Sequence, residues 1–105
     1  MGEKKFEIPS DNKLLKADIQ KNKKKYMNHV LSVFEEITKM DKFPSKLNFF
    51  NFENTNLEVI IKKESYLSNL NNLLDYYSEL EEYELCNTIS NLIEYIKNNS
   101  NSEDL

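Results

Sequence analysis

The chain has 105 residues and a net charge of −4, and it contains one glycine and one cysteine. Its length suits one domain, which buries about two-thirds of its extended surface and is too small for a deep cleft between domains. One glycine excludes the glycine-rich loops that bind nucleotide phosphates, and one cysteine excludes an internal disulfide framework. We therefore expect no cofactor and a reducing compartment.

The sequence contains no apolar run that suits a membrane. No stretch approaches the roughly 18 consecutive apolar residues of a membrane-spanning helix, and the first residues lack the apolar segment of a signal peptide. The expectation is a soluble cytoplasmic protein without a membrane partner. All basic residues are lysines and asparagine is frequent, which is typical of an AT-rich genome such as that of a low-GC bacterium or its phage.

Charges are distributed unequally along the chain. Residues 1–63 contain 13 lysines and 9 acidic residues, a net charge of +4, whereas residues 64–105 contain one lysine and 9 acidic residues, a net charge of −8. The two halves should therefore attract each other. This attraction either holds a basic N-terminal helix on an acidic hairpin or leaves one basic and one acidic face for partners.

The N-terminal part predicts a short flexible segment followed by a long helix. Residues 1–9 are mostly polar and are expected to be flexible. Residues 10–41 contain no glycine or proline, and apolar side chains from Tyr26 to Met40 recur at helical spacing. We expect one helix over 10–41. A break near Asn22 is the alternative, because lysines there separate two apolar clusters.

The segment 46–62 changes from helical periodicity to two runs rich in aromatic and β-branched residues. A polar stretch at 54–56 separates the runs, which predicts a β-hairpin with its turn there. Two strands alone are marginally stable in water, so the hairpin must lie on the helices or pair with another chain. Its edge is a candidate for strand addition by a partner, unless Lys62 and Lys63 protect it.

Residues 65–97 show the clearest pattern of the chain, two apolar stripes that are offset by one residue. The first stripe ends at Leu80 and the second begins at Leu85, and both advance in alternating four- and three-residue steps. An offset of one residue rotates a stripe by about 100° around the helix axis, so one straight helix would carry two misaligned apolar faces. The sequence therefore predicts two antiparallel helices joined by a turn near 81–83.

The second of these helices begins with an acidic, an aromatic and an acidic residue, followed by apolar residues at regular intervals: Glu82, Tyr83, Glu84, Leu85, Cys86, Ile89 and Ile93. This pattern resembles the UVR motif, a helical hairpin of nucleotide-excision-repair proteins and of activators of Clp chaperones. The resemblance implies a hairpin that docks on a protein. The chain departs from the motif at Asn87, Ser90 and Asn91, where the family has a small residue and an Arg-Asp pair. Homology and convergence both remain open.

Aromatic and acidic side chains outside the apolar stripes suggest a docking surface, because aromatic residues are enriched in protein interfaces. Phe49, Phe50 and Phe52 add to this expectation, since a two-stranded ribbon cannot turn all three to one side. The alternative is that the long first helix covers both sets of aromatic residues. We expect the hairpin to bind a protein partner, or a second copy of the chain as a homodimer. The candidate protein-binding residues are Tyr76, Glu79, Glu82, Tyr83 and Tyr95.

An alternative function is nucleic-acid association through a cluster of lysines with Tyr26 beside it. Phosphates would attract the lysines, and the tyrosine ring could stack on a base. The acidic net charge and the absence of arginine argue against this role, and Tyr26 also fits the core register. The lysines of this alternative are Lys21, Lys23, Lys24 and Lys25.

No catalytic or metal site is expected. His29 is the only histidine and Cys86 lies on an apolar stripe, so neither has the partners that a zinc site or a nucleophilic pair requires. Glu81 and Glu84 belong to a solvent-facing turn, which does not desolvate a carboxyl group for acid–base catalysis.

The sequence as a whole predicts a mainly helical α+β protein. Its parts are a long N-terminal helix, a β-hairpin and a C-terminal antiparallel helical hairpin, followed by a disordered tail over 99–105. The function that fits these parts is a non-enzymatic adaptor or regulatory module that binds protein.

Overall fold

The computed structural model describes residues 6–103. Within this range the chain forms a mainly helical α+β fold with four α-helices, two short 3-10 helices and a three-stranded sheet in the order β1-β2-β3. In chain order the elements are β1 (Glu7–Ile8), α1 (Asn12–Lys21), α2 (Lys23–Glu35), η1 (Glu36–Lys39), β2 (Lys46–Phe52), β3 (Glu58–Lys62), η2 (Lys63–Ser65), α3 (Tyr66–Glu79) and α4 (Tyr83–Glu103).

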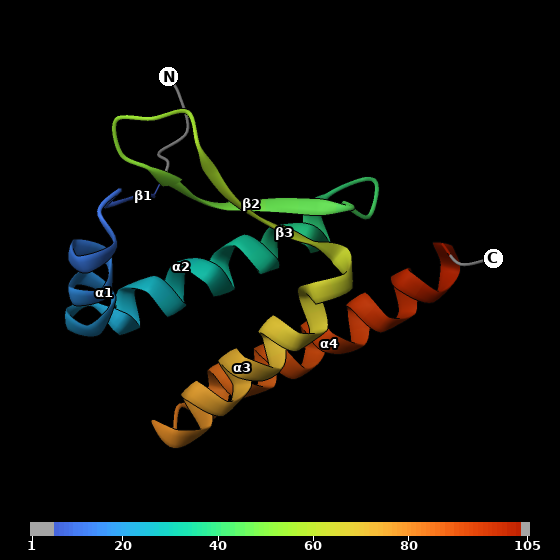
Figure 1. The fold of residues 1–105 in the computed structure, drawn as a ribbon. Coiled ribbons are helices and arrows are strands. Elements are labelled where there is room, and N and C mark those ends of the chain that lie inside the picture. The colour runs from blue at the N-terminus through green and yellow to red at the C-terminus, as the bar shows by residue number, and fades with distance from the viewer. Residues whose placement is uncertain (1–5, 104–105) are drawn as a thin grey trace.

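Helix α2 is the central element of the fold (Figure 1). The sheet lies on one side of α2, and the α3–α4 pair lies on the other. Phe34 of α2 is fully buried, and its ring contacts Phe49 of β2 and Tyr66 of α3 with centroid distances of 5.0 and 5.7 Å. The buried residues of these elements form one core: Leu31, Phe34, Ile37, Leu47, Phe49, Tyr66, Leu70, Leu73, Tyr77, Ile89, Leu92 and Ile96.

Helices α3 and α4 form the antiparallel hairpin that the offset stripes predict (Figure 1). The turn is a Schellman motif, in which the N–H of Glu82 donates to the carbonyl of Tyr77 and the N–H of Glu81 donates to that of Ser78, both at 3.0 Å. Glu81 has a φ of 59°, the left-handed conformation that glycine usually supplies in this motif. The turn therefore forms without the glycine that would have marked it in the sequence.

The long helix expected over 10–41 is divided at Asn22, the position of the alternative. The N–H of Asn22 donates to the carbonyl of Asp18 at 2.8 Å, and its side-chain amide donates to the Asp18 carboxylate at 2.9 Å. Asparagine readily interrupts a helix because its side chain competes for backbone hydrogen bonds. The bend also lets the Tyr26 hydroxyl donate to Asp18. Helix α2 then ends at Glu35, where η1 replaces it.

The N-terminal segment is more ordered than expected over the part that the structure describes. Residues 1–5 lie outside the described residues, but Glu7–Ile8 form β1 and pair in parallel with the end of β2. The N–H of Asn51 donates to the carbonyl of Phe6 at 3.0 Å, and Ile8 is 3% exposed. Two strand residues are too few to show a periodicity, so sequence reasoning missed this strand.

The C-terminal tail also differs from the expectation of disorder over 99–105. Helix α4 continues to Glu103, while residues 104–105 lie outside the described residues. No glycine or proline follows Lys97 to end the helix, so the polar composition misled the prediction.

Strands β2 and β3 form the predicted β-hairpin, and Asn54 in its turn has a φ of 61°. A β-bulge interrupts their register before Phe50. Because a bulge adds one residue to a strand, Phe49 and Phe50 face the same side. Phe49 contacts Phe34, and Phe50 contacts Tyr26, both on α2. The aromatic side chains of this strand are therefore less exposed than expected: Phe49 is buried, and Phe50 and Phe52 are half-buried.

The left-handed turn at Glu81 predicts a stabilising substitution. Glu81→Gly should raise the free energy of unfolding by about 0.5–1 kcal/mol, because relief of the left-handed strain exceeds the extra chain entropy of glycine. Urea denaturation measures this change. Glu81→Ala is the matched control, since it makes the same charge change but keeps Cβ, and it should alter the free energy by less than about 0.5 kcal/mol. Equal effects of the two substitutions would contradict the turn geometry.

Candidate functional site

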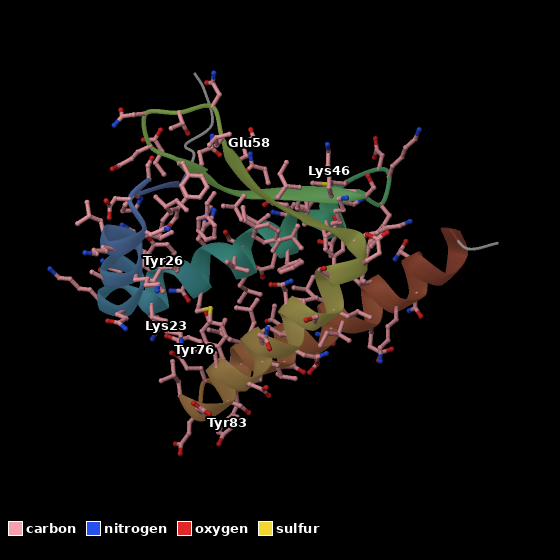
Figure 2. The ribbon with its side chains drawn as sticks, in the orientation of Figure 1. Lys23, Tyr26, Lys46, Glu58, Tyr76 and Tyr83 are labelled. Carbon is pink, nitrogen blue, oxygen red and sulfur yellow. The ribbon has the colours of Figure 1, made fainter. Side chains whose placement is uncertain are left out.

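Two sets of candidate residues meet at one corner of the molecule, where the start of α2 approaches the turn between α3 and α4. Figure 2 shows Lys23, Tyr76 and Tyr83 at this corner. The Nζ atom of Lys23 lies 5.6 Å from the centroid of the Tyr76 ring, within cation–π range. Nζ of Lys24 lies 2.6 Å from Oε2 of Glu82. The lysine cluster and the acidic hairpin are therefore in direct contact.

These contacts join the basic and acidic halves of the chain. They fit the interpretation in which charge attraction holds a basic N-terminal helix on the acidic hairpin. The hydrogen bond with Glu82, together with its negative charge, raises the pKa of the Lys24 ammonium group. Both side chains keep much solvent exposure, 58% for Lys24 and 33% for Glu82, so the pair orients the hairpin more than it stabilises the fold. Lys25 lies over the Phe6 ring with its Nζ 5.4 Å from the centroid. Lys21 is exposed at the end of α1.

Tyr26 is part of the core rather than of an exposed stacking surface. It is 6% exposed, and its hydroxyl donates to Asp18. Burial and this hydrogen bond raise its pKa well above the ordinary value of a tyrosine. Its ring contacts Phe6 and Phe50 with centroid distances of 5.1 and 5.5 Å. The core register predicted for Tyr26 is confirmed, and the ring is not positioned to stack on a base.

The turn between the two C-terminal helices presents apolar surface inside an acidic rim. We call residues 79–84 the hairpin tip. Tyr83 is 67% exposed and Leu80 is 46% exposed, the two large apolar side chains of the tip. Within residues 6–103 three carboxylates around them form no ion pair and are exposed: Glu79, Glu81 and Glu84. Glu84 also lies in the first turn of α4, where the helix dipole favours a negative charge.

Four of the five candidate protein-binding residues belong to this corner. Tyr76 is half-buried and packs edge to face on Tyr77, with ring centroids 5.0 Å apart, while Lys23 covers it from α2. Glu79, Glu82 and Tyr83 lie in the hairpin tip itself. The fifth candidate, Tyr95, lies apart from the tip.

Tyr95 is half-buried against the core and stands about 18 Å along α4 from Tyr83, given the rise of a helix. The structure therefore does not bring Tyr95 to the tip. Leu80 is a tip residue that sequence reasoning assigned to the buried stripe. Its position as the last residue of that stripe, where α3 ends, is the signal that could have shown its exposure.

His29 and Cys86 have structural environments. A ring nitrogen of His29, Nε2, lies 2.7 Å from the carbonyl oxygen of Phe49, and the imidazole packs on Phe6 with a centroid distance of 4.6 Å. His29 thereby covers a part of β2 that β1 is too short to pair. The thiol of Cys86 is half-buried, with its Sγ 4.0 Å from the carbonyl oxygen of Leu74.

Comparison with known protein families, curated proteins and solved structures finds no match for this chain. Within residues 6–103 no group of three or more histidine, cysteine, aspartate or glutamate side chains could hold a metal ion. None of the helices in the same range is long and apolar enough to cross a membrane.

Tyr77 supports the hairpin near the tip and predicts a pH dependence. Its ring is fully buried, its hydroxyl donates to Oδ1 of Asn28, and burial raises its pKa to about 12. A tyrosine whose pKa is higher in the folded state stabilises the fold below pH 10, and this contribution is lost as the pH rises from 10 to about 12. We expect the free energy of unfolding of Tyr77→Phe to fall less steeply over this range.

Chemical denaturation at a series of pH values measures the slope. Tyr83→Phe is the matched control because Tyr83 is exposed, and it should keep the slope of the unsubstituted chain. A slope unchanged by Tyr77→Phe would contradict the buried position of this hydroxyl.

Proposed function

We propose that the protein is a non-enzymatic adaptor or regulatory module that docks on a protein partner through the hairpin tip. The observation that carries the proposal is the 67% exposure of Tyr83 beside the half-exposed Leu80. Two exposed apolar side chains side by side inside a polar rim are typical of a protein interface, in which a tyrosine is often the central anchor. The tip has both parts, an apolar centre and a rim of carboxylates.

The charges of the tip define the partner that it fits. Glu79, Glu81 and Glu84 leave the rim negative, so the complementary surface is an apolar pocket flanked by lysine or arginine. Long-range attraction between the acidic C-terminal half and such a surface speeds their encounter and depends on salt. Lys23 and Lys24 contact Tyr76 and Glu82 from the side and fix the base of the tip.

The resemblance to the UVR motif is consistent with this proposal. Tyr83 and Glu84 stand at the start of the second helix, where that motif has its aromatic and acidic residues, and the helical hairpin that the motif implies is present. Docking by a hairpin is thus proposed from shape and from the exposed tip. The Arg-Asp pair of the motif is replaced by Ser90 and Asn91, so the proposal does not include the recognition that this pair performs.

The first test is the loss of binding when the anchor is removed. The chain is used to capture its partner from the source cells, and the purified pair is titrated by calorimetry. Tyr83→Ala should raise the dissociation constant about 30-fold or more, as expected for a central aromatic anchor. Met40→Ala is the control, because Met40 is 41% exposed but lies outside the tip, at the end of η1. Equal affinities of the two variants would refute docking through the tip.

The alternative function, nucleic-acid association through Lys21, Lys23, Lys24 and Lys25, has weaker support. Lys24 is paired with Glu82, and the ring that would stack on bases, Tyr26, is buried.

A gel-shift titration distinguishes the two functions. We expect any binding to single- or double-stranded nucleic acid at physiological salt to be weaker than about 100 μM, below the range of typical non-specific binders. The control replaces the four lysines of the cluster by glutamate. Tighter binding that weakens steeply with salt and disappears in this variant would favour the alternative over docking.

A further inference from the structure

Strand β3 ends the sheet, and no described strand pairs with its outer edge. Its five residues read Glu-Val-Ile-Ile-Lys, so it has an acidic residue at one end, a basic residue at the other and isoleucine at its centre. Glu58, Ile60 and Lys62 are exposed, and Ile60 retains 42% of its accessible surface. An edge of this kind is a template for pairing with another strand.

The backbone groups that point to this edge follow from the pairing of β3 with β2. The carbonyl of Leu57 accepts from the N–H of Phe52 at 3.0 Å, and the N–H of Lys63 donates to the carbonyl of Ser45 at 2.8 Å. An antiparallel strand turns the backbone groups of alternate residues to alternate sides, so the odd-numbered residues of β3 face β2. The outward-facing groups belong to the even-numbered residues: Glu58, Ile60 and Lys62.

We propose that two copies of the chain form a dimer by antiparallel pairing of their β3 strands, with the two-fold axis at Ile60. In this register Ile60 lies opposite Ile60 of the partner subunit, and Glu58 lies opposite Lys62 of the partner subunit. Symmetry makes the second charge contact the same as the first. The outward N–H and C=O groups of all three residues then find partners, and the two sheets become one continuous sheet.

The charges select this register over its neighbours. A shift in either direction places Glu58 or Lys62 opposite Ile60 of the partner subunit, or opposite its own copy. Like charges directly opposite each other destabilise a strand pair, whereas opposite charges stabilise it. The symmetric register about Ile60 therefore satisfies both ends of the strand at once. Lysine at an edge discourages indiscriminate strand addition, but here the same strand carries the glutamate that complements it.

Among residues 6–103, neither Glu58 nor Lys62 forms an ion pair. Lys62 lies directly opposite Lys46 of β2, and Glu58 lies opposite the uncharged Asn51. Figure 2 places Lys46 and Glu58 at opposite ends of the ribbon. In the dimer, Glu58 of the partner subunit flanks Lys62 on the side away from Lys46. The unbalanced basic end of one copy thus meets the unbalanced acidic end of the other.

The dimer goes beyond docking through the hairpin tip and uses a different surface. The sheet and the α3–α4 pair lie on opposite sides of α2, so pairing of the sheets leaves both tips exposed (Figure 1). Contact between two tips is disfavoured because both are acidic. One short strand pair buries less than a standard interface, so the dimer should be reversible, with a dissociation constant between about 1 μM and 1 mM.

Charge reversal tests the proposal directly. Glu58→Lys places lysines opposite each other at both ends of the paired strands, and Lys62→Glu places glutamates there. Each variant alone should raise the dissociation constant of the dimer at least about tenfold, measured by sedimentation equilibrium. An equimolar mixture of the two variants should associate as the unsubstituted chain does, because both contacts between unlike copies are attractive.

Two further measurements complete the test. Glu94→Lys makes the same charge change at an exposed position of α4 and should leave the dissociation constant unchanged. Amide exchange of Ile60 in the unsubstituted chain should slow as concentration rises, whereas Ile61, which faces β2, should be protected at all concentrations. A chain that stays monomeric at about 1 mM would overturn the proposal. Single variants that associate normally, or a mixture that stays monomeric, would also overturn it.

Discussion

The fold depends on the one-residue offset between the apolar stripes of the C-terminal third. Because the stripes are misaligned on a single helix, the chain buries both by turning back at Glu81. The resulting hairpin offers one continuous apolar face that includes Leu70 and Ile89, both fully buried. Helix α2 covers that face and in turn supports the sheet. The position of the exposed tip therefore follows from this offset.

Sequence reasoning succeeded where a pattern repeats over several turns and was wrong where one tertiary contact decides. The stripes of α3 and α4 extend over several turns, so the helical hairpin could be predicted without a marked turn residue. The division at Asn22 depends on Asp18, which accepts hydrogen bonds from both Asn22 and Tyr26 across the bend. The bulge before Phe50 likewise depends on α2, which provides aromatic partners for two successive side chains. No periodicity in the sequence contains this information.

The candidate site was predictable to the same degree. Tyr83 and the carboxylates of the tip fall outside both stripes, and this position alone indicated an exposed surface. The contacts of Lys23 with Tyr76 and of Lys24 with Glu82 join residues more than 50 positions apart, so they could not be derived from spacing. Tyr95 shows the limit of the argument: a residue at the edge of a stripe can be covered by a neighbouring element, which the sequence does not identify.

The charge distribution of the chain contributes little to the stability of the fold. Lys24 and Glu82 join the basic and acidic halves, but this pair is exposed to solvent and contributes little to stability. Glu79, Glu81 and Glu84 of the tip and the two charges at the ends of β3 form no ion pair within the described residues. At both places the unbalanced charge lies beside an exposed apolar side chain, Tyr83 in one case and Ile60 in the other. Such an arrangement costs the monomer little, because the charges are hydrated, and it adds orientation and selectivity when a complementary surface covers the apolar residue.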